Sequence, residues 1–275
     1  MSDGSASRIP VAISIAGSDS GGGAGIQADL KAFAAAGVHG ATAITALTAQ
    51  NTVGVTAVHA VPPPMIIEQV RVVAEDLGID AVKIGMLGGA ETIDAVVEAL
   101  GHVGGAPVVL DPVMVAESGA ALLDPEATAA LVERLLPLAT VATPNLPEAR
   151  AMARVGEGAD QEELARAVQA LGPDAVIVTG GHTEAGLDVL YEGEGEPLRI
   201  AGPRYPEGTS HGSGCTHSST IAALLAQGAS VREAAVAARA ITANAVRDGL
   251  RGIGAGAGPV DVFGIGRRAA TGDED

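Results

Sequence analysis

Short apolar runs alternate along the chain with longer segments in which apolar residues recur every three or four positions. The runs at residues 11–16, 81–84 and 108–110 are typical of strands that are buried on both faces of a sheet. Residues 26–36 and 65–77 have the apolar spacing of helices that cover such a sheet. This alternation predicts an α/β fold with a mostly parallel central sheet and helices on both faces. We expect further strands and helices at 41–48, 91–100, 141–143, 175–178 and 218–226.

Polar residues mark the starts of three later helices. Residues 124–126, Asp-Pro-Glu, supply a cap, a first-turn proline and an acid before an apolar stripe. Asp160 with Glu163, and Ser230 with Glu233, have the spacing of capping boxes. Each signal precedes apolar residues at helical spacing, so we expect a helix to begin at each of them.

The pattern also predicts a small β-hairpin or lid. Residues 187–191 and 198–200 are short apolar runs joined by a polar segment that contains glycine. No internal repeat and no linker divides the sequence. We therefore expect a single domain over residues 1–275, with flexible tails at 1–9 and 266–275.

The composition restricts the partners and the compartment. The chain has 275 residues, is 47% hydrophobic and carries a net charge of −17. Such an acidic surface repels nucleic acid and anionic membranes, and no apolar run reaches the ~20 residues of a spanning helix. One cysteine cannot form an internal disulfide, and residues 1–10 lack the apolar core of a signal peptide. We expect a cytoplasmic protein without nucleic-acid or membrane partners.

The segment 211–216, His-Gly-Ser-Gly-Cys-Thr, leads directly into an apolar helical pattern. The first N–H groups of a helix have no partner within it, and that end is partly positive. Glycines let a ligand approach the backbone closely, so the segment predicts a pocket for an anion, most often phosphate. Cys215 would lie in this positive field, which favours its thiolate. The alternative is a glycine-rich turn followed by a buried, inert cysteine.

Glycines also crowd the loop 17–25, between an expected strand and an expected helix. Gly23, Gly25 and Ala28 form a loose dinucleotide-binding fingerprint, but the next strand ends near residues 48–51 without the acid that such a site needs. The loop also lacks the lysine and hydroxyl pair of a P-loop. It is therefore either a tight turn or a loop that wraps a substrate.

Asn145 and Glu148 lie three residues apart at another expected helix start. Their oxygens suit Mg²⁺ and its waters, but the same spacing also makes a capping box. The six histidines are scattered and show no zinc pattern; His182 and His211 lie beside glycine turns and are expected to line a site at most. Ligands of open α/β sheets bind where strands end, so these segments are expected to meet at one edge of the sheet.

Seven segments together carry a resemblance to a known family: 16–31, 45–52, 83–86, 111–114, 143–149, 180–182 and 211–216. In this order they resemble the hydroxymethylpyrimidine/phosphomethylpyrimidine kinases of thiamine biosynthesis, within the ribokinase superfamily, over residues 11–263. The resemblance implies a three-layer ribokinase-like fold and a kinase that depends on ATP and Mg²⁺. Its expected substrate is 4-amino-5-hydroxymethyl-2-methylpyrimidine, which receives one phosphate on its hydroxymethyl oxygen and then a second, on the path to thiamine diphosphate.

The resemblance also implies three groups of site residues. The pyrimidine-binding positions are Gly17, Asp29, Gln50, Met86 and Val113. The nucleotide-binding positions are Asn145, Glu148, Thr179 and Gly180, with Asp111 and Glu148 as metal ligands, directly or through water. The catalytic positions are Gly212, Ser213, Gly214 and Cys215, whose amides would neutralise the transferred phosphoryl group. Cys215 stands where the sugar kinases of the superfamily carry an aspartate base.

Three positions depart from the pattern of the family. Thr179 and Glu117 stand where lysine is common, and residues 254–259 lack a frequent histidine. Because the superfamily often forms dimers, we expect a homodimer. Two alternatives remain open for the function, namely a pyridoxal or pyridoxine kinase of the same fold and a pyrimidine sensor without catalytic activity. Turnover of the two substrates would separate the kinases, and binding without ATP turnover would identify a sensor.

Overall fold

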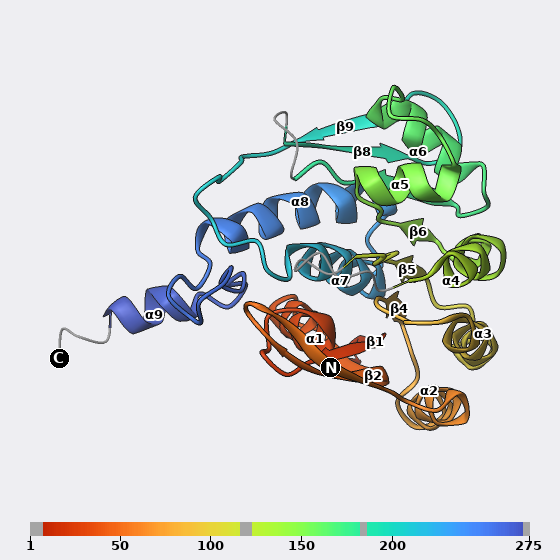
Figure 1. Ribbon diagram of the computed structural model, residues 1–275, viewed down its shortest axis with the longest axis horizontal. Helices are drawn as coiled ribbons and strands as arrows, with labels where there is room; N and C mark the ends of the chain where they lie inside the picture. The colour runs from red at the N-terminus through yellow and green to blue at the C-terminus, as the bar shows by residue number, and fades with distance from the viewer. Residues whose placement is uncertain (1–7, 116–122, 182–185, 272–275) are drawn as a thin grey trace, which may run out of the picture.

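The computed structural model describes residues 8–115, 123–181 and 186–271. The described strands form one sheet with the order β3-β2-β1-β4-β5-β6-β7-β8-β9 (Figure 1). They are β1 (Val11–Asp19), β2 (His39–Asn51), β3 (Gly54–Ala60), β4 (Ala81–Ile84), β5 (Val108–Leu110), β6 (Val141–Ala142), β7 (Ala175–Val178), β8 (Leu187–Tyr191) and β9 (Leu198–Ala201). The neighbours from β2 to β7 are parallel, whereas β3, β8 and β9 pair antiparallel at the two edges. The expectation of a mostly parallel sheet is confirmed.

Helices cover both faces of this sheet (Figure 1). Phe33, Ile221 and Ala234 belong to an apolar core beneath α1, α7 and α8, while Ile66 and Ile93 belong to the core beneath α2 to α6 on the other face. The helices are α1 (Gly25–Ala35), α2 (Pro63–Leu77), α3 (Ala90–Ala99), α4 (Pro125–Ala130), α5 (Leu146–Ala153), α6 (Gln161–Gln169), α7 (Ser213–Ala226), α8 (Val231–Arg247) and α9 (Ile265–Thr271). Short 3₁₀ segments (Leu100–His102 and Leu136–Leu138) and a π-helical turn (Leu131–Leu135) follow α3 and α4. The three-layer α/β architecture is thus confirmed.

The three predicted helix starts are also confirmed. The Asp124 carboxylate accepts the N–H of Ala127 at the start of α4. Complete capping boxes open α6, through Asp160 and Glu163, and α8, through Ser230 and Glu233. Among the described residues, no helix combines the length and the apolar character needed to cross a lipid bilayer.

Both edges of the sheet carry a hairpin, of which only one was expected. Strands β8 and β9 form the predicted hairpin, but β8 pairs with β7, so the hairpin extends the sheet. The second hairpin joins β2 to β3, and its strand Gly54–Ala60 was missed. Most of the β3 side chains are exposed, so this strand lacks the apolar run that reveals a buried one. Thr48 and Gln50 of β2, and Val55 and Val58 of β3, line the cavity described below.

Residues within both expected tails contact the body of the protein, and the flexibility of the tails stays a prediction. Arg8 pairs with the Asp80 carboxylate at 2.9 Å and donates a second hydrogen bond to the Leu77 carbonyl. The segment 266–271 is helical, because it belongs to α9. Helix α9 is tied back to the end of α8 by an ion pair between Arg267 and Asp248 at 2.7 Å. The other residues of the two tails, 1–7 and 272–275, lie outside the described part of the chain.

Candidate active site

A cavity of about 780 Å³ opens along the edge of the sheet where the parallel strands end. Twelve of the fourteen site positions expected from the sequence line it, and they come from segments far apart in the chain. They are Gly17, Gln50, Met86, Asp111, Val113, Asn145, Glu148, Thr179, Gly212, Ser213, Gly214 and Cys215. The site lies where ligands of open α/β sheets bind.

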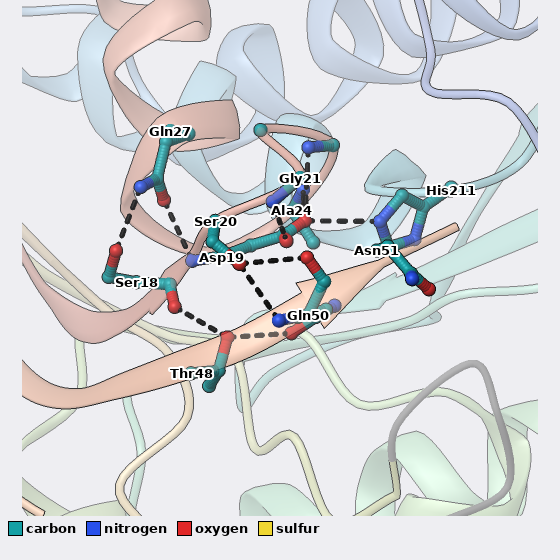
Figure 2. Close-up of polar contacts among 12 residues, drawn as sticks. Ser18, Asp19, Ser20, Gly21, Ala24, Gln27, Thr48, Gln50, Asn51 and His211 are labelled. Atoms are coloured by element: carbon teal, nitrogen blue, oxygen red, sulfur yellow. Dashed lines mark hydrogen bonds and ion pairs between the residues drawn. The ribbon is translucent and has the colours of Figure 1, made fainter. Parts of the chain in front are cut away.

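Asp19 organises the loop between β1 and α1 (Figure 2). Its carboxylate accepts the backbone N–H groups of Gly21, Gly23 and Ala24 at 2.8 to 3.0 Å. The second oxygen also lies 3.1 Å from Nε2 of His211. Burial alone would raise the pKa of Asp19, but these hydrogen bonds lower it overall, so the group is a carboxylate at neutral pH. The sequence had suggested a turn or a wrapping loop here, and the structure shows a tight loop with an anionic centre.

Gln50 approaches this loop from the end of β2 (Figure 2). Its backbone N–H and C=O are both bonded to the Ser20 hydroxyl at 2.8 Å. Its side-chain oxygen lies 3.2 Å from the hydroxyl of Thr48, which also donates to the carbonyl of Ser18. The glutamine amide is thereby held at the cavity wall beside the β1 loop. A side chain that both donates and accepts suits the edge of an aminopyrimidine.

The segment 210–216 forms the turn and helix start that were expected. Gly212 has a φ of 81° and is the N-cap of α7. A Cβ on Gly212 would lie 1.9 Å from the carbonyl oxygen of Gly23, so only glycine fits against the β1 loop at this position. By helix geometry, the N–H groups of Gly214 and Cys215 have no partner within α7. They lie in the cavity wall, where a phosphoryl group can accept their hydrogen bonds.

The expected acidity of Cys215 is contradicted. Burial of the thiol raises its pKa to about 12, against the lowering effect of the nearby Lys83 ammonium. The carboxylates of Asp29 and Asp111 raise it further. The helix N-terminus was expected to favour the thiolate, but loss of hydration and two nearby negative charges outweigh it. The side chain is half-buried and carries a neutral thiol at pH 7 in this structure.

Asp29 does not line the cavity, which corrects the expected direct contact with the pyrimidine. It is completely buried on α1. Its oxygens accept the hydroxyls of Ser14 and Ser219 at 2.6 Å and pair with the Lys83 ammonium at 3.0 Å. Both oxygens are thus engaged by protein groups, and Asp29 is linked to the cavity through Lys83.

Lys83 lines the cavity but was not expected there from the sequence. Its side chain is fully buried and yet forms part of the cavity wall. The ammonium pairs with Asp29 and also interacts electrostatically with Asp111 and Cys215. Burial lowers the pKa of this ammonium, but the adjacent carboxylates more than compensate and the pKa is raised, so the charge is retained. The available signal was a lysine inside the apolar strand 81–84, because an unpaired charge is almost never buried there.

Two acidic side chains face the cavity next to this lysine. Asp111 follows β5 and accepts the Ser218 hydroxyl at 3.0 Å, and burial raises its pKa. Glu148 forms a capping box with Asn145, with both hydrogen bonds at 2.9 Å. Burial, and then the charge of Asp111, raise the pKa of Glu148 to about 7. Asn145 and Glu148 thus cap α5 and also line the cavity. The two interpretations of this pair, as a helix cap and as ligands for Mg²⁺ and its waters, are therefore compatible.

These carboxylates fit a magnesium nucleotide better than a metal held by protein alone. Within the described ranges, no group of three or more His, Cys, Asp or Glu side chains is arranged to hold a metal ion. Mg²⁺ is typically bound by one or two carboxylates, with phosphates and waters completing the shell. Asp111 and Glu148 supply that number of carboxylates at the cavity wall.

The far end of the cavity lies over β7 and β8. Thr179 lines it, but Gly180 does not, which corrects the expected contact with the nucleotide. A Cβ on Gly180 would lie 1.9 Å from the Leu187 carbonyl oxygen, and its N–H donates to Asp188 at 2.9 Å. Gly180 therefore permits the close approach of β7 to β8, and Gly181 reaches the cavity instead. Glu117 and His182, which the sequence analysis discussed, lie outside the described residues.

Comparisons with known proteins identify the family that the sequence resembles. A family model described as phosphomethylpyrimidine kinase matches residues 19–261. A hydroxymethylpyrimidine/phosphomethylpyrimidine kinase of Rhizobium meliloti (strain 1021) is 50% identical over 259 residues, covering 92% of this chain and 97% of that protein. An ADP complex of Bacillus subtilis pyridoxal kinase is similar in structure, with a TM-score of 0.85 at 36% identity, covering 94% of this chain and 98% of that one. A phosphomethylpyrimidine kinase of Clostridium difficile 630 has a TM-score of 0.74 at 40% identity, covering 84% and 96%.

Proposed function

The chain belongs to the phosphomethylpyrimidine kinase family, and from this membership we propose that it transfers the terminal phosphate of ATP to a hydroxymethylpyrimidine in thiamine biosynthesis. The expected substrate is 4-amino-5-hydroxymethyl-2-methylpyrimidine, followed by its monophosphate. The use of ATP is supported by the ADP complex of the similar pyridoxal kinase. The fold and the order of the site residues fit this activity.

One observation carries the proposal, namely the order of side chains along the sheet edge. Gln50 on β2 lies at the end of the cavity that suits a pyrimidine, and Glu148 lies beyond β6 at the end that suits a nucleotide. Between them, the N-terminus of α7 faces Asp111 after β5. The pyrimidine and the nucleotide would therefore meet over the helix N-terminus, where the transferred group carries its charge.

The residues of the chain supply positioning and charge rather than covalent chemistry. In phosphoryl transfer the protein acts mainly by alignment and by stabilising the charge on the equatorial oxygens. We assign this stabilisation to the N–H groups of Gly214 and Cys215 and to the Lys83 ammonium. Asp111 and Glu148 would hold Mg²⁺, directly or through water; when bound, it neutralises the phosphate oxygens. This set of two carboxylates fits that role.

Cys215 orients the substrate hydroxyl in this proposal. A thiol whose pKa is about 12 is a poor general base at neutral pH. In phosphoryl transfer the transition state is loose, which means that the bond to the leaving group is already weak when the new bond forms. The protein therefore has little covalent chemistry to perform. The hydroxyl proton passes to an oxygen of the transferred phosphoryl group as the new P–O bond forms and the bond to the ADP oxygen breaks, and the thiol only fixes the direction of attack.

The test is an ATP-consumption assay with purified protein and Mg²⁺, in which products are resolved by mass. Hydroxymethylpyrimidine and pyridoxal are offered in parallel. A pyrimidine product with one and then two phosphates supports the proposal. The structural similarity to pyridoxal kinase makes that activity the second candidate, and phosphorylated pyridoxal as the sole product would favour it. Ligand binding without a product would instead favour a sensor.

Three expectations from the sequence stay predictions beside this proposal. They are a homodimer, a location in the cytoplasm and a single domain over the whole chain. The nine described strands lie in one sheet, which supports the single domain. Size-exclusion chromatography with light scattering measures the mass of the assembly in solution and tests the homodimer.

A further inference from the structure

Four polar side chains form a buried cluster at the nucleotide end of the cavity. They come from β8, α7 and α8, and all line the cavity with at most 7% of their surface exposed. They are Asp188, His217, Arg239 and Thr242. None of these residues is used by the phosphoryl-transfer geometry described above. The cluster therefore needs a separate explanation.

Much of the hydrogen-bonding capacity of this cluster is unused. Both ring nitrogens of His217, Nε of Arg239 and Oγ1 of Thr242 are buried and have no hydrogen-bond partner among the described residues. Buried polar atoms without a partner are costly, so an exception calls for a reason such as a ligand. The fixed contacts of the cluster are on its outer side, where Arg239 donates to the Gly186 carbonyl and Asp188 accepts the Gly180 N–H at 2.9 Å.

The charge of the cluster is close to zero. Asp188 and Arg239 form a long ion pair, with Oδ2 and Nε 3.7 Å apart. The His217 ring lies 3.5 Å from the same carboxylate, but burial lowers its pKa, so the imidazole is neutral at pH 7. Arg239 lowers this pKa further, while the more distant Asp111 and the adjacent Asp188 oppose the change. A net-neutral set of donors and acceptors suits hydroxyl groups better than an anionic phosphate.

The position of the cluster also favours a sugar. Asp188 lies on β8, which is three strands away from β5 in the sheet. Asp111 follows β5 and faces the point of phosphoryl transfer. Three strand spacings are about 14 Å, a separation that an extended triphosphate spans together with its ribose and the side chains that bind its two ends. The phosphates would therefore occupy β5 to β7, and the nucleoside would begin at β8. Beyond Thr242, Ala243 and Val246 of α8 also line the cavity, as does Tyr205. These side chains offer an apolar surface to a base.

We propose that Asp188, His217, Arg239 and Thr242 form a subsite for the ribose hydroxyls of the nucleotide and make the enzyme prefer ribonucleotides to deoxyribonucleotides. The Asp188 carboxylate accepts a sugar hydroxyl, and Arg239 and Thr242 donate to its oxygens. A site built to bond a hydroxyl discriminates strongly against a ligand that lacks it, because its own buried groups are then left unpaired. This inference rests on the proposed use of a nucleotide, but not on the identity of the pyrimidine.

The test is calorimetric titration of the full chain, with Mg²⁺, using ADP, 2′-deoxy-ADP, 3′-deoxy-ADP and tripolyphosphate. At least one deoxynucleotide is expected to bind about 10- to 100-fold more weakly than ADP, the range for a lost hydrogen bond to a charged partner. This comparison needs no variant. Equal affinities for the three nucleotides, or binding of none of them, would overturn the proposal. Failure of the kinase proposal has a different signature, namely ADP binding without a phosphorylated pyrimidine.

Variants then assign the preference to the cluster. Thr242→Val keeps the shape of the side chain, and His217→Leu removes the ring nitrogens. Both variants are expected to bind ADP about 3- to 30-fold more weakly and to bind the weaker deoxynucleotide as the parent protein does. The preference for ADP over that deoxynucleotide then becomes smaller. Tripolyphosphate should bind as it does to the parent protein. A loss of tripolyphosphate binding equal to the loss of ADP binding would show a phosphate site and sink the ribose assignment.

The matched control is Thr220→Val. Thr220 is a buried threonine of the same helix as His217, but its hydroxyl donates to the Thr216 carbonyl at 2.7 Å and it does not line the cavity. This variant should keep the preference for ADP over the deoxynucleotides at the parent value. A control that lost the preference to the same extent as Thr242→Val would mean that a general loosening of the fold, rather than the cluster, controls it.

Discussion

The carboxylate of Asp19 lies 3.1 Å from Nε2 of His211, and this contact joins the two glycine-rich segments of the cavity (Figure 2). Asp19 also holds the β1 loop through three backbone N–H groups. His211 directly precedes the N-cap of α7, and its ring packs so closely on Gly23 that a Cβ there would lie 2.1 Å from it. The β1 loop and the turn that precedes α7 are thus held as one unit.

Replacement of His211 should therefore disturb alignment more than binding. We expect His211→Ala to lower kcat about 10- to 100-fold while the KM values change only a few-fold, since a displacement of about 1 Å near the reacting atoms has effects of this size. His211→Gln keeps a donor near the position of Nε2 and should recover part of the loss. Steady-state kinetics of the three proteins test this. Equal kcat for the Ala and Gln variants, or a loss confined to KM, would refute the positioning role.

Removal of Lys83 should destabilise the protein by leaving a buried charge. Lys83→Met leaves the Asp29 carboxylate with two serine hydroxyls and no cation. Breaking a buried ion pair from one side typically costs about 3–5 kcal/mol. Urea denaturation should show this loss in the single variant and a partial recovery in Lys83→Met with Asp29→Asn. A single variant within about 1 kcal/mol of the parent, or a double variant without any recovery, would contradict the account.

The reactivity of Cys215 gives a direct measure of its protonation. Because burial raises its pKa to about 12, the thiolate fraction is small at pH 8 and should rise about tenfold for each pH unit up to that pKa. Alkylation by iodoacetamide is therefore expected to be slow near neutrality and still accelerating at pH 10. The chain has one cysteine, so the measured rate belongs to this residue. A rate that levels off by about pH 10 would indicate an ordinary thiol pKa, and one that levels off between pH 7 and 8 would indicate a depressed pKa.

Glu148 should lower stability at neutral pH in the absence of ligands. Burial raises its pKa from 4.5 to about 7, so between these values the folded state binds more protons than the unfolded state. The free energy of unfolding then falls as the pH rises through this window and levels off above it. We expect Glu148→Gln, which keeps the cap, to match the parent near pH 4.5 and to exceed it by roughly 3 kcal/mol above pH 7.

Denaturant melts of both proteins at several pH values check this expectation. The same variant should bind Mg·ADP more weakly, because it lacks the anionic oxygen that suits the metal. A stability difference that does not change with pH would mean that the carboxyl group is ionised normally. A variant that binds Mg·ADP as tightly as the parent would remove Glu148 from the metal site.

Gln50 should contribute to the pyrimidine affinity directly. We expect Gln50→Ala to weaken pyrimidine binding by roughly 1–3 kcal/mol, the scale of a lost polar contact in a buried site, and to leave ADP binding unchanged. Thr56→Val on the same hairpin is the control, since Thr56 is exposed and does not line the cavity. Titration with hydroxymethylpyrimidine measures both. An unchanged dissociation constant for Gln50→Ala would place the pyrimidine elsewhere in the cavity.

The sequence predicts the fold well where the local pattern and the tertiary environment agree. The buried strands at 81–84 and 175–178 have the predicted bounds, because strands covered on both faces must be apolar throughout. Strand β3 has no such cover, and its pairing with β2 is a contact of the backbone that no side-chain pattern records. The helix caps were also predictable, since the capping groups lie within four residues of each other.

The residues that line the cavity were more predictable from the sequence than their charge states. Gly212 and Asn145 were identified because glycine turns and helix caps are local features. The raised pKa of Cys215 depends on Asp29, Asp111 and burial, which only the packing of three layers brings together. Asp29 itself was assigned to the ligand, whereas the fold gives its oxygens to Ser14, Ser219 and Lys83. The charge state of a buried group depends on residues that are distant in the sequence. A local sequence pattern does not show which residues these are.

The place of Tyr205 in the cavity wall gives this protein an optical reporter of its own. The chain has no tryptophan and only two tyrosines. Tyr191 lies on β8 beneath Arg166, with its hydroxyl bonded to the Gly193 carbonyl, and does not line the cavity. Tyr205 does line it, with the Arg247 guanidinium 5.7 Å from its ring. Ultraviolet emission from the unlabelled protein therefore comes from one phenol at the site and one outside it, and a change in that emission on adding a nucleotide reports occupancy of the site.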